Sequence, residues 1–166
     1  MSALEAGARA ADFTLPALDK KTYSLEEALK SGPVLAAFFK SSCPVCQFTF
    51  PFLERFYRHF RDTKAHIWAV SQDEREEAHE FASEYGLTMA VLLDDVQHNY
   101  PVSNAYGLTH VPTIFLIDQA GGILHSSVGF VQKDLVQIAR KLETLTGKKG
   151  FVPFRPHDEV PEWRGG

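Results

Sequence analysis

The chain has 166 residues, 45% of them hydrophobic, and a formal net charge of −4. This length suits one domain with its own hydrophobic core, and Cys43 and Cys46 are too few for the disulfide scaffold of a small secreted fold. No basic run is longer than Lys148–Lys149, which argues against nucleic acid as the main partner, because phosphate binding needs clustered cations. No apolar run approaches the roughly 18 residues that span a bilayer.

The chain before Cys43 predicts two short strands, a short helix and a buried strand. The segments "DFTL" and "TYSL" have strand character and flank a turn at residues 16–21. Ser24 and Glu27 have the spacing of a capping box and predict a short helix as far as Lys30. The apolar run "VLAAFF" has the length of a buried central strand.

A helix is expected directly after Cys43, because apolar residues then recur at every third or fourth position and form one face. These residues are Val45, Phe48, Phe52, Phe56 and Phe60. Pro44 lies in the first turn, where a missing N–H costs nothing, and Pro51 lies inside the helix, where we expect a bend. The phenylalanines are expected in the core, with Phe48 or Phe50 as candidates to rim a substrate groove.

The second half of the chain alternates strands and helices and closes with a hairpin and a last helix. In order, it predicts a strand "HIWAVS", a helix "DEREEAHEFASEYG", a strand "MAVLL", a short helix "VSNAYGL", the hairpin "TIFLID" and "ILHSSVGF", and a helix "QKDLVQIARKLETLTG". Asp73 is expected to cap the first of these helices, Gly86 to end it, and Gly147 to end the last.

The tail over residues 150–166 holds three prolines after Phe151 and is expected to be neither helix nor inner strand. Its Phe154 and Trp163 favour docking onto the domain or onto a neighbouring subunit. We therefore expect a single α/β domain over residues 1–166, with a mixed central sheet and a core of about residues 8–146.

Several motifs resemble those of the thioredoxin fold. A C-x-x-C between a buried strand and a helix is the redox motif of that fold. "HVPTIFLID" looks like its cis-proline segment, with Pro112 in the cis position and Val111 before it. Gly129 and Pro51 stand where the fold commonly has a glycine and a helix-kinking proline. The opening "GARAADFTLPALDKKTYSLEEALKSGPVLAAFF" is similar to the alkyl hydroperoxide reductase/thiol-specific antioxidant and TlpA-like subfamilies.

This resemblance covers roughly residues 8–145. It implies a thioredoxin-like three-layer sandwich, in which a mixed central sheet has helices on both faces. It also implies an N-terminal strand extension and a helix–strand insert between Gln72 and Pro112.

The resemblance implies a thiol-disulfide oxidoreductase in which Cys43 is the exposed nucleophile and Cys46 resolves the mixed disulfide. The start of a helix favours the anion of Cys43. Val111 and Pro112 are expected to pair with an extended substrate segment. The substrate-binding surface is expected to include Pro44 and Val45, which also tune the potential. Lys40 is either a solvated strand end or a cation that favours the Cys43 thiolate.

Departures from the family keep two alternatives open. Ala37 and Thr49 stand where relatives keep a carboxylate that helps move a proton. The first alternative is a peroxiredoxin-like thiol peroxidase with Cys43 as the peroxidatic residue, although Lys40 replaces the threonine that orients peroxide in that family. The second is a non-catalytic binding module that keeps only the fold.

We expect no metal, and no cofactor beyond the Cys43–Cys46 pair, because a zinc site needs about four ligands and the sequence has no second C-x-x-C. The partners implied are a protein or small-molecule disulfide, or a hydroperoxide, and an electron-donating reductase. We expect a monomer or a weak homodimer. "MSALEAGARAADFTL" does not read as a signal peptide. We therefore expect a cytoplasmic protein, or a periplasmic or other extracytoplasmic one if a leader has been removed.

Overall fold

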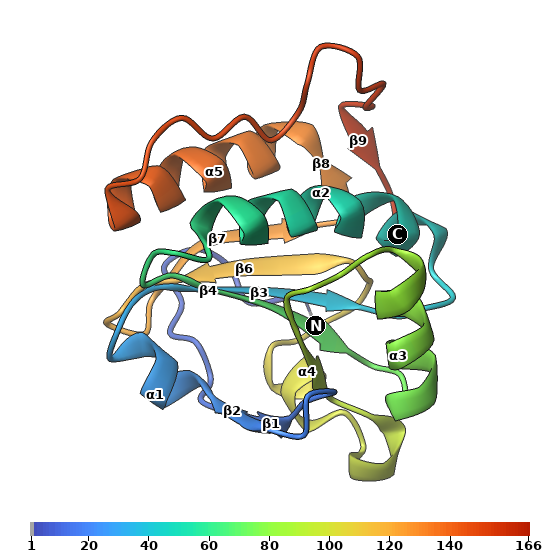
Figure 1. The fold of residues 1–166 in the computed structure, drawn as a ribbon. Coiled ribbons are helices and arrows are strands. Elements are labelled where there is room, and N and C mark those ends of the chain that lie inside the picture. The colour runs from blue at the N-terminus through green and yellow to red at the C-terminus, as the bar shows by residue number, and fades with distance from the viewer. Residues whose placement is uncertain (1) are drawn as a thin grey trace.

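The central element of the computed structural model, which describes residues 2–166, is a five-stranded mixed sheet in the order β5-β4-β3-β6-β7 (Figure 1). Strand β4 is parallel to both β3 and β5, and β6 is antiparallel to both β3 and β7. The strands are β3 (Val34–Phe39), β4 (His66–Ser71), β5 (Ala90–Leu93), β6 (Thr113–Ile117) and β7 (Ile123–Val128).

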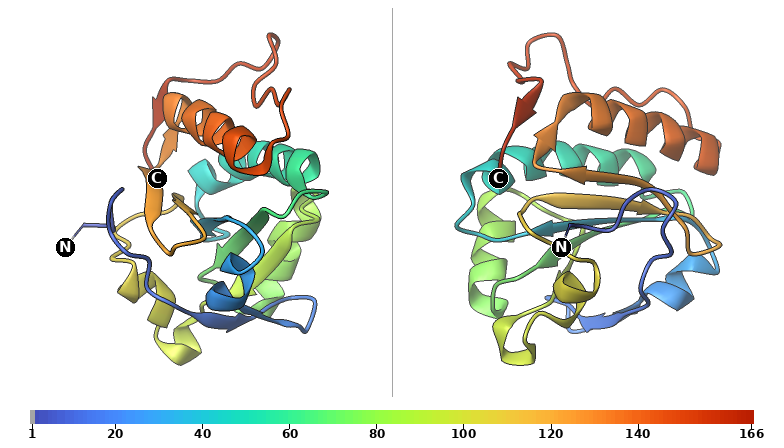
Figure 2. Two further views of the ribbon diagram at one scale, coloured as in Figure 1. Left: turned by 90° about the vertical axis from the view of Figure 1, so that its left-hand side faces the viewer. Right: turned by 180° about the vertical axis from the view of Figure 1, so that it is seen from behind.

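Helices cover both faces of this sheet (Figures 1 and 2). One face carries α2 (Pro44–Phe60) and α5 (Gln132–Thr146), with α3 (Arg75–Glu84) packed at the β5 side. The other face carries α1 (Leu25–Leu29), α4 (Pro101–Ala105) and the hairpin of β1 (Thr14–Pro16) and β2 (Thr22–Ser24). The remaining elements are η1 (Val96–His98), β8 (Phe130–Val131) and β9 (Trp163–Arg164). The predicted three-layer thioredoxin-like sandwich is confirmed.

The apolar run of β3 is buried on both faces of the sheet. All six of its residues are buried, and they alternate between two cores. Leu35, Ala37 and Phe39 face the core under α2 and α5, whereas the alternate residues face the core under α1 and α4. A strand between two such cores needs a continuous apolar sequence, which is why "VLAAFF" predicts this place correctly.

One predicted helix cap is present and another is not. The Ser24 hydroxyl accepts a hydrogen bond from the Glu27 N–H at 3.2 Å, as the capping box predicts. Asp73 does not cap α3, so that prediction is wrong: the cap position is Glu74, without a side-chain hydrogen bond. The Asp73 carboxylate instead accepts hydrogen bonds from Ser41, which lies beside it because β3 and β4 run parallel.

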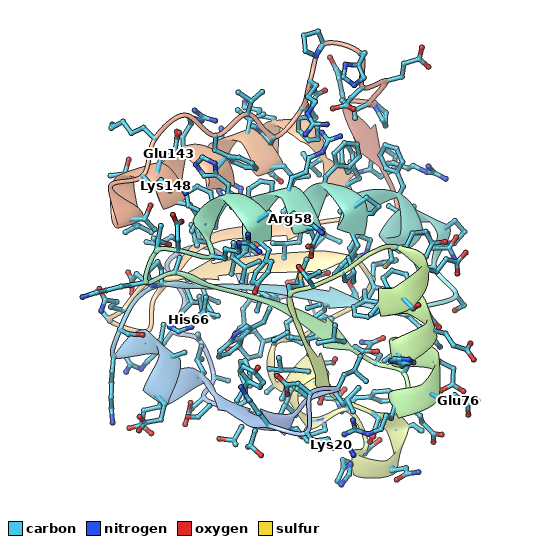
Figure 3. The ribbon with its side chains drawn as sticks, viewed as in Figure 1. Lys20, Arg58, His66, Glu76, Glu143 and Lys148 are labelled. Carbon is cyan, nitrogen blue, oxygen red and sulfur yellow. The ribbon has the colours of Figure 1, made fainter. Side chains whose placement is uncertain are left out.

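The tail docks onto its own domain, across the layer of α2 and α5. It begins where Glu143 and Lys148 lie at the end of α5 (Figure 3), and Lys148 binds Asp62 after α2 at 2.8 Å. Phe151 is buried against Phe56 and Phe60, with ring centroids 4.7 and 5.4 Å away.

The side chain of Trp163 does not dock onto the domain, because the residue is 66% exposed and only its backbone is paired. Docking of Trp163 onto a neighbouring subunit stays a prediction. Over residues 2–166 we find no helix with both the length and the apolar character needed to cross a bilayer.

Replacing Phe151 with alanine should lower the free energy of unfolding by about 3–5 kcal/mol, because it opens a cavity between α2, α5 and the tail. The neighbouring Val152 is 61% exposed, so Val152→Ala should change that free energy by less than about 0.5 kcal/mol. Urea unfolding of both variants measures this difference. A loss for Phe151→Ala as small as that expected for Val152→Ala would show that the Phe151 ring does not contribute to the core.

Candidate active site

The two cysteines lie at the junction of β3 and α2 with very different access to solvent. Cys43 is the N-cap residue of α2, and its backbone is extended there (φ −86°, ψ 113°). Its sulfur accepts a hydrogen bond from the Cys46 N–H at 3.3 Å. Cys43 is half-buried and Cys46 is fully buried, and both are free thiols. The structure thus places one reachable thiol and one covered thiol within a single helical turn.

Burial raises the pKa of the Cys46 thiol. A backbone hydrogen bond with Lys40 opposes this shift, whereas Cys43 and the negative charge of Asp73 add to it. At neutral pH Cys46 is therefore held as a neutral thiol in a dry setting. A neutral thiol does not attack a disulfide, because the thiolate is the nucleophile. Cys46 is therefore unreactive until it loses its proton.

The predicted cis-proline segment faces Cys43. The Val111–Pro112 peptide bond is cis, and the Val111 carbonyl accepts a hydrogen bond from the Cys43 thiol at 3.5 Å. The Pro112 carbonyl accepts a hydrogen bond from the Gly129 N–H at 2.8 Å. Gly129 has a positive φ of 80°, a backbone conformation that favours glycine. Three segments far apart in the sequence therefore meet at one point.

The other predicted site residues differ in their exposure to solvent. The Lys40 side chain is exposed, and its carbonyl accepts the Cys43 N–H at 3.0 Å. Pro44 is exposed in the first turn of α2. Val45 is only 6% exposed and packs in the core, so the structure does not bring its side chain to the expected substrate-binding surface. His110 is exposed, as a surface histidine would be.

The loop before Cys43 is held by an aspartate that the sequence did not single out for this role. Asp73 accepts hydrogen bonds from the Ser41 N–H at 2.8 Å and the Ser41 hydroxyl at 2.9 Å. It also accepts one from the Ser71 hydroxyl at 3.1 Å. Asp73 and Ser41 are 32 residues apart, so no local pattern could have found this contact. The signal lies only in the topology, because parallel neighbours end at the same edge of a sheet.

The two positions at which the resemblance implies a carboxylate are occupied by buried, uncharged residues. Ala37 is 2% exposed, and Thr49 is fully buried. The Thr49 hydroxyl donates to the Val45 carbonyl at 2.6 Å within α2. The environment of Cys46 is therefore mainly apolar, which is the cause of its raised pKa.

Comparisons with known proteins agree with this geometry. The profile of the AhpC/TSA family matches residues 6–126. The chain is 30% identical over 131 residues to the thiol-disulfide oxidoreductase ResA of Bacillus subtilis, covering 78% of this chain and 71% of that protein. It is 29% identical over 137 residues to the ResA of Halalkalibacterium halodurans, covering 82% of this chain and 76% of that one.

A solved structure is also similar, that of a putative thiol:disulfide interchange protein DsbE from Chlorobium tepidum. Its TM-score is 0.74 at 26% identity, and the match covers 86% of this chain and 98% of that one. These relatives confirm the prediction of a thiol-disulfide oxidoreductase over the peroxidase and the non-catalytic alternatives. The family match, which spans more than half of the sequence, shows that the chain belongs to the AhpC/TSA family.

Proposed function

We propose that Cys43 and Cys46 exchange electrons with disulfides in polypeptide substrates, with no cofactor beyond the pair itself. The observation that carries this proposal is the unequal access of the two thiols beside the cis-proline backbone. Cys43 is reachable at the start of α2, whereas Cys46 is fully buried one turn away. An exposed first nucleophile and a covered second one are what a two-step exchange requires.

In the first step, the Cys43 thiolate attacks one sulfur of the substrate disulfide. The substrate S–S bond breaks, a Cys43–substrate disulfide forms, and the leaving thiolate takes a proton from solvent. The N–H of Cys46 already points at the Cys43 sulfur and stabilises negative charge there. The Val111 backbone, beside the same sulfur, offers a surface along which an extended substrate segment lies.

In the second step, the Cys46 thiol gives its proton to solvent, and the resulting thiolate attacks the Cys43 sulfur. The mixed disulfide breaks, the Cys43–Cys46 disulfide forms, and the second substrate sulfur leaves as a thiolate. Two electrons have then passed from the pair to the substrate. A separate dithiol donor must return them before another cycle, and the same steps run in reverse when the pair acts as the oxidant.

Removing the resolving thiol should trap the substrate. In Cys46→Ser the first step proceeds and the second cannot, so a mixed disulfide should accumulate, whereas Cys43→Ser should form none and should lose insulin reduction. Non-reducing gel electrophoresis measures the amount of mixed disulfide, and treatment with dithiothreitol, which should release the substrate, is the control.

Peroxide consumption by the wild type should be slow compared with insulin reduction. A peroxide rate well above the insulin rate, with no trapped adduct, would favour the peroxidase reading instead.

The resolving step should speed up as the pH rises. Because the pKa of Cys46 is raised by burial, its thiolate fraction is small at neutral pH and grows about tenfold per pH unit below that pKa. The rate at which a preformed Cys43–thionitrobenzoate adduct releases its chromophore should therefore rise about tenfold per unit between roughly pH 6 and 9. A flat profile would mean that another group takes the Cys46 proton.

A further inference from the structure

Residues 162–166 lie beside the active site, although most of the tail before them lies over the helices. From Phe151 it runs back along α2 and α5 toward the start of α2 (Figure 1). Two anchors hold this path before the end. Phe154 packs on Phe52, with ring centroids 5.2 Å apart, and Asp158 pairs with Arg55 at 2.7 Å. These anchors direct residues 162–166 toward the start of α2.

The segment 162–166, which we call the strap, adds a strand to the edge at β8. Arg164 pairs with Phe130 and Trp163 pairs with Val131, both antiparallel. The Gln132 N–H donates to the Glu162 carbonyl at 2.9 Å. The approach is close, because a Cβ on Gly129 would lie 2.8 Å from the Arg164 carbonyl oxygen.

The strap then reaches the backbone that faces Cys43. A Cβ on Gly166 would collide with the Val111 carbonyl oxygen and would lie 3.2 Å from Cδ of Pro112. The Cys43 thiol donates to that same Val111 carbonyl at 3.5 Å. The strap and the nucleophile therefore meet at one backbone oxygen, on the surface where the proposed function places an extended substrate segment.

The strap is held loosely compared with the rest of the tail. All of its residues are exposed, and Trp163 is 66% exposed. Besides the backbone contacts, the Arg164 guanidinium of the strap lies 5.4 Å from the centre of the Phe48 ring. Exposed hydrogen bonds with few buried contacts open at low cost, so the strap is suited to being displaced.

We propose that the strap is an intramolecular pseudosubstrate, which a polypeptide substrate must displace to reach Cys43. The substrate class that fits is an extended segment that pairs with the edge at β8, as the strap does, and lies against the Val111 backbone. Small disulfides reach the half-buried Cys43 without displacing it. This inference rests on the proposed function for its substrate, but the strap's effect on access to Cys43 does not.

The test compares the full chain with a variant that ends at Pro161, which lacks the strap and keeps the tail's anchors. Both carry Cys46→Ser, so that Cys43 is the only thiol. Labelling of Cys43 by a polymer-linked maleimide should be about tenfold faster without the strap, whereas labelling by iodoacetamide should change by less than about twofold. Val152→Ala, elsewhere in the tail, should label like the full chain.

A second arm uses proteins that keep both cysteines. Insulin reduction should rise about tenfold without the strap, and a synthetic peptide of residues 160–166 should reverse the gain while a scrambled peptide should not. Circular dichroism and the unfolding midpoint check the shortened chain. If it does not fold, Arg164→Ala replaces it, with the same expected direction.

The two proposals fail in different ways. Equal labelling by the polymer reagent with and without the strap would overturn the pseudosubstrate, even if insulin is reduced. A labelling difference without insulin reduction in any variant would overturn the proposed function and leave the strap's covering of Cys43 standing.

Discussion

The parallel pairing of β3 with β4 is the interaction on which the site depends. Its register joins Val34 to His66 and Phe39 to Ser71, so both strands end at the same edge of the sheet. Asp73 follows one strand and Ser41 the other, and their hydrogen bonds fix the loop that leads to Cys43. A nucleophile must be held within a fraction of an ångström of its productive place, and a loop alone rarely achieves that. Here the sheet edge supplies the rigidity.

The difference between the two thiols follows from the same geometry. Strand β3 is buried at the centre of the sheet. The chain leaves this strand at the edge of the sheet, where the first turn of α2 begins. Cys43 caps that turn and remains reachable, whereas Cys46, three residues later, turns back into the core among apolar residues. The neutral form of Cys46 is favoured because the thiolate is poorly solvated there. The start of α2 therefore gives the two thiols the unequal access on which the proposed order of attack rests, with no charged side chain at Ala37 or Thr49.

Features with a local signal could be predicted from the sequence, and features made by distant contacts could not. The run "VLAAFF", the C-x-x-C and the V-P-T segment each carry their own pattern, and they correctly predict the central strand, the strand–helix junction at the cysteines and the cis-proline. The local sequence of Asp73 predicts a helix cap, but its carboxylate instead binds Ser41, which is 32 residues away in the sequence. For Val45 two patterns disagree: its place in the C-x-x-C predicts a substrate contact, whereas the apolar spacing along the helix predicts the core, and the structure agrees with the spacing.

The edge at β8 links the stability of the tail to the chemistry of the site. An uncovered strand edge invites pairing with any extended chain, and proteins usually cover or blunt such edges. The strap covers this edge with the same backbone hydrogen bonds that an extended substrate would use. A stronger cover would protect the edge better but would also exclude polypeptide substrates from Cys43. The tail divides these two roles along its length, because Phe151 is buried and Asp158 is paired with Arg55, whereas every residue of the strap is exposed.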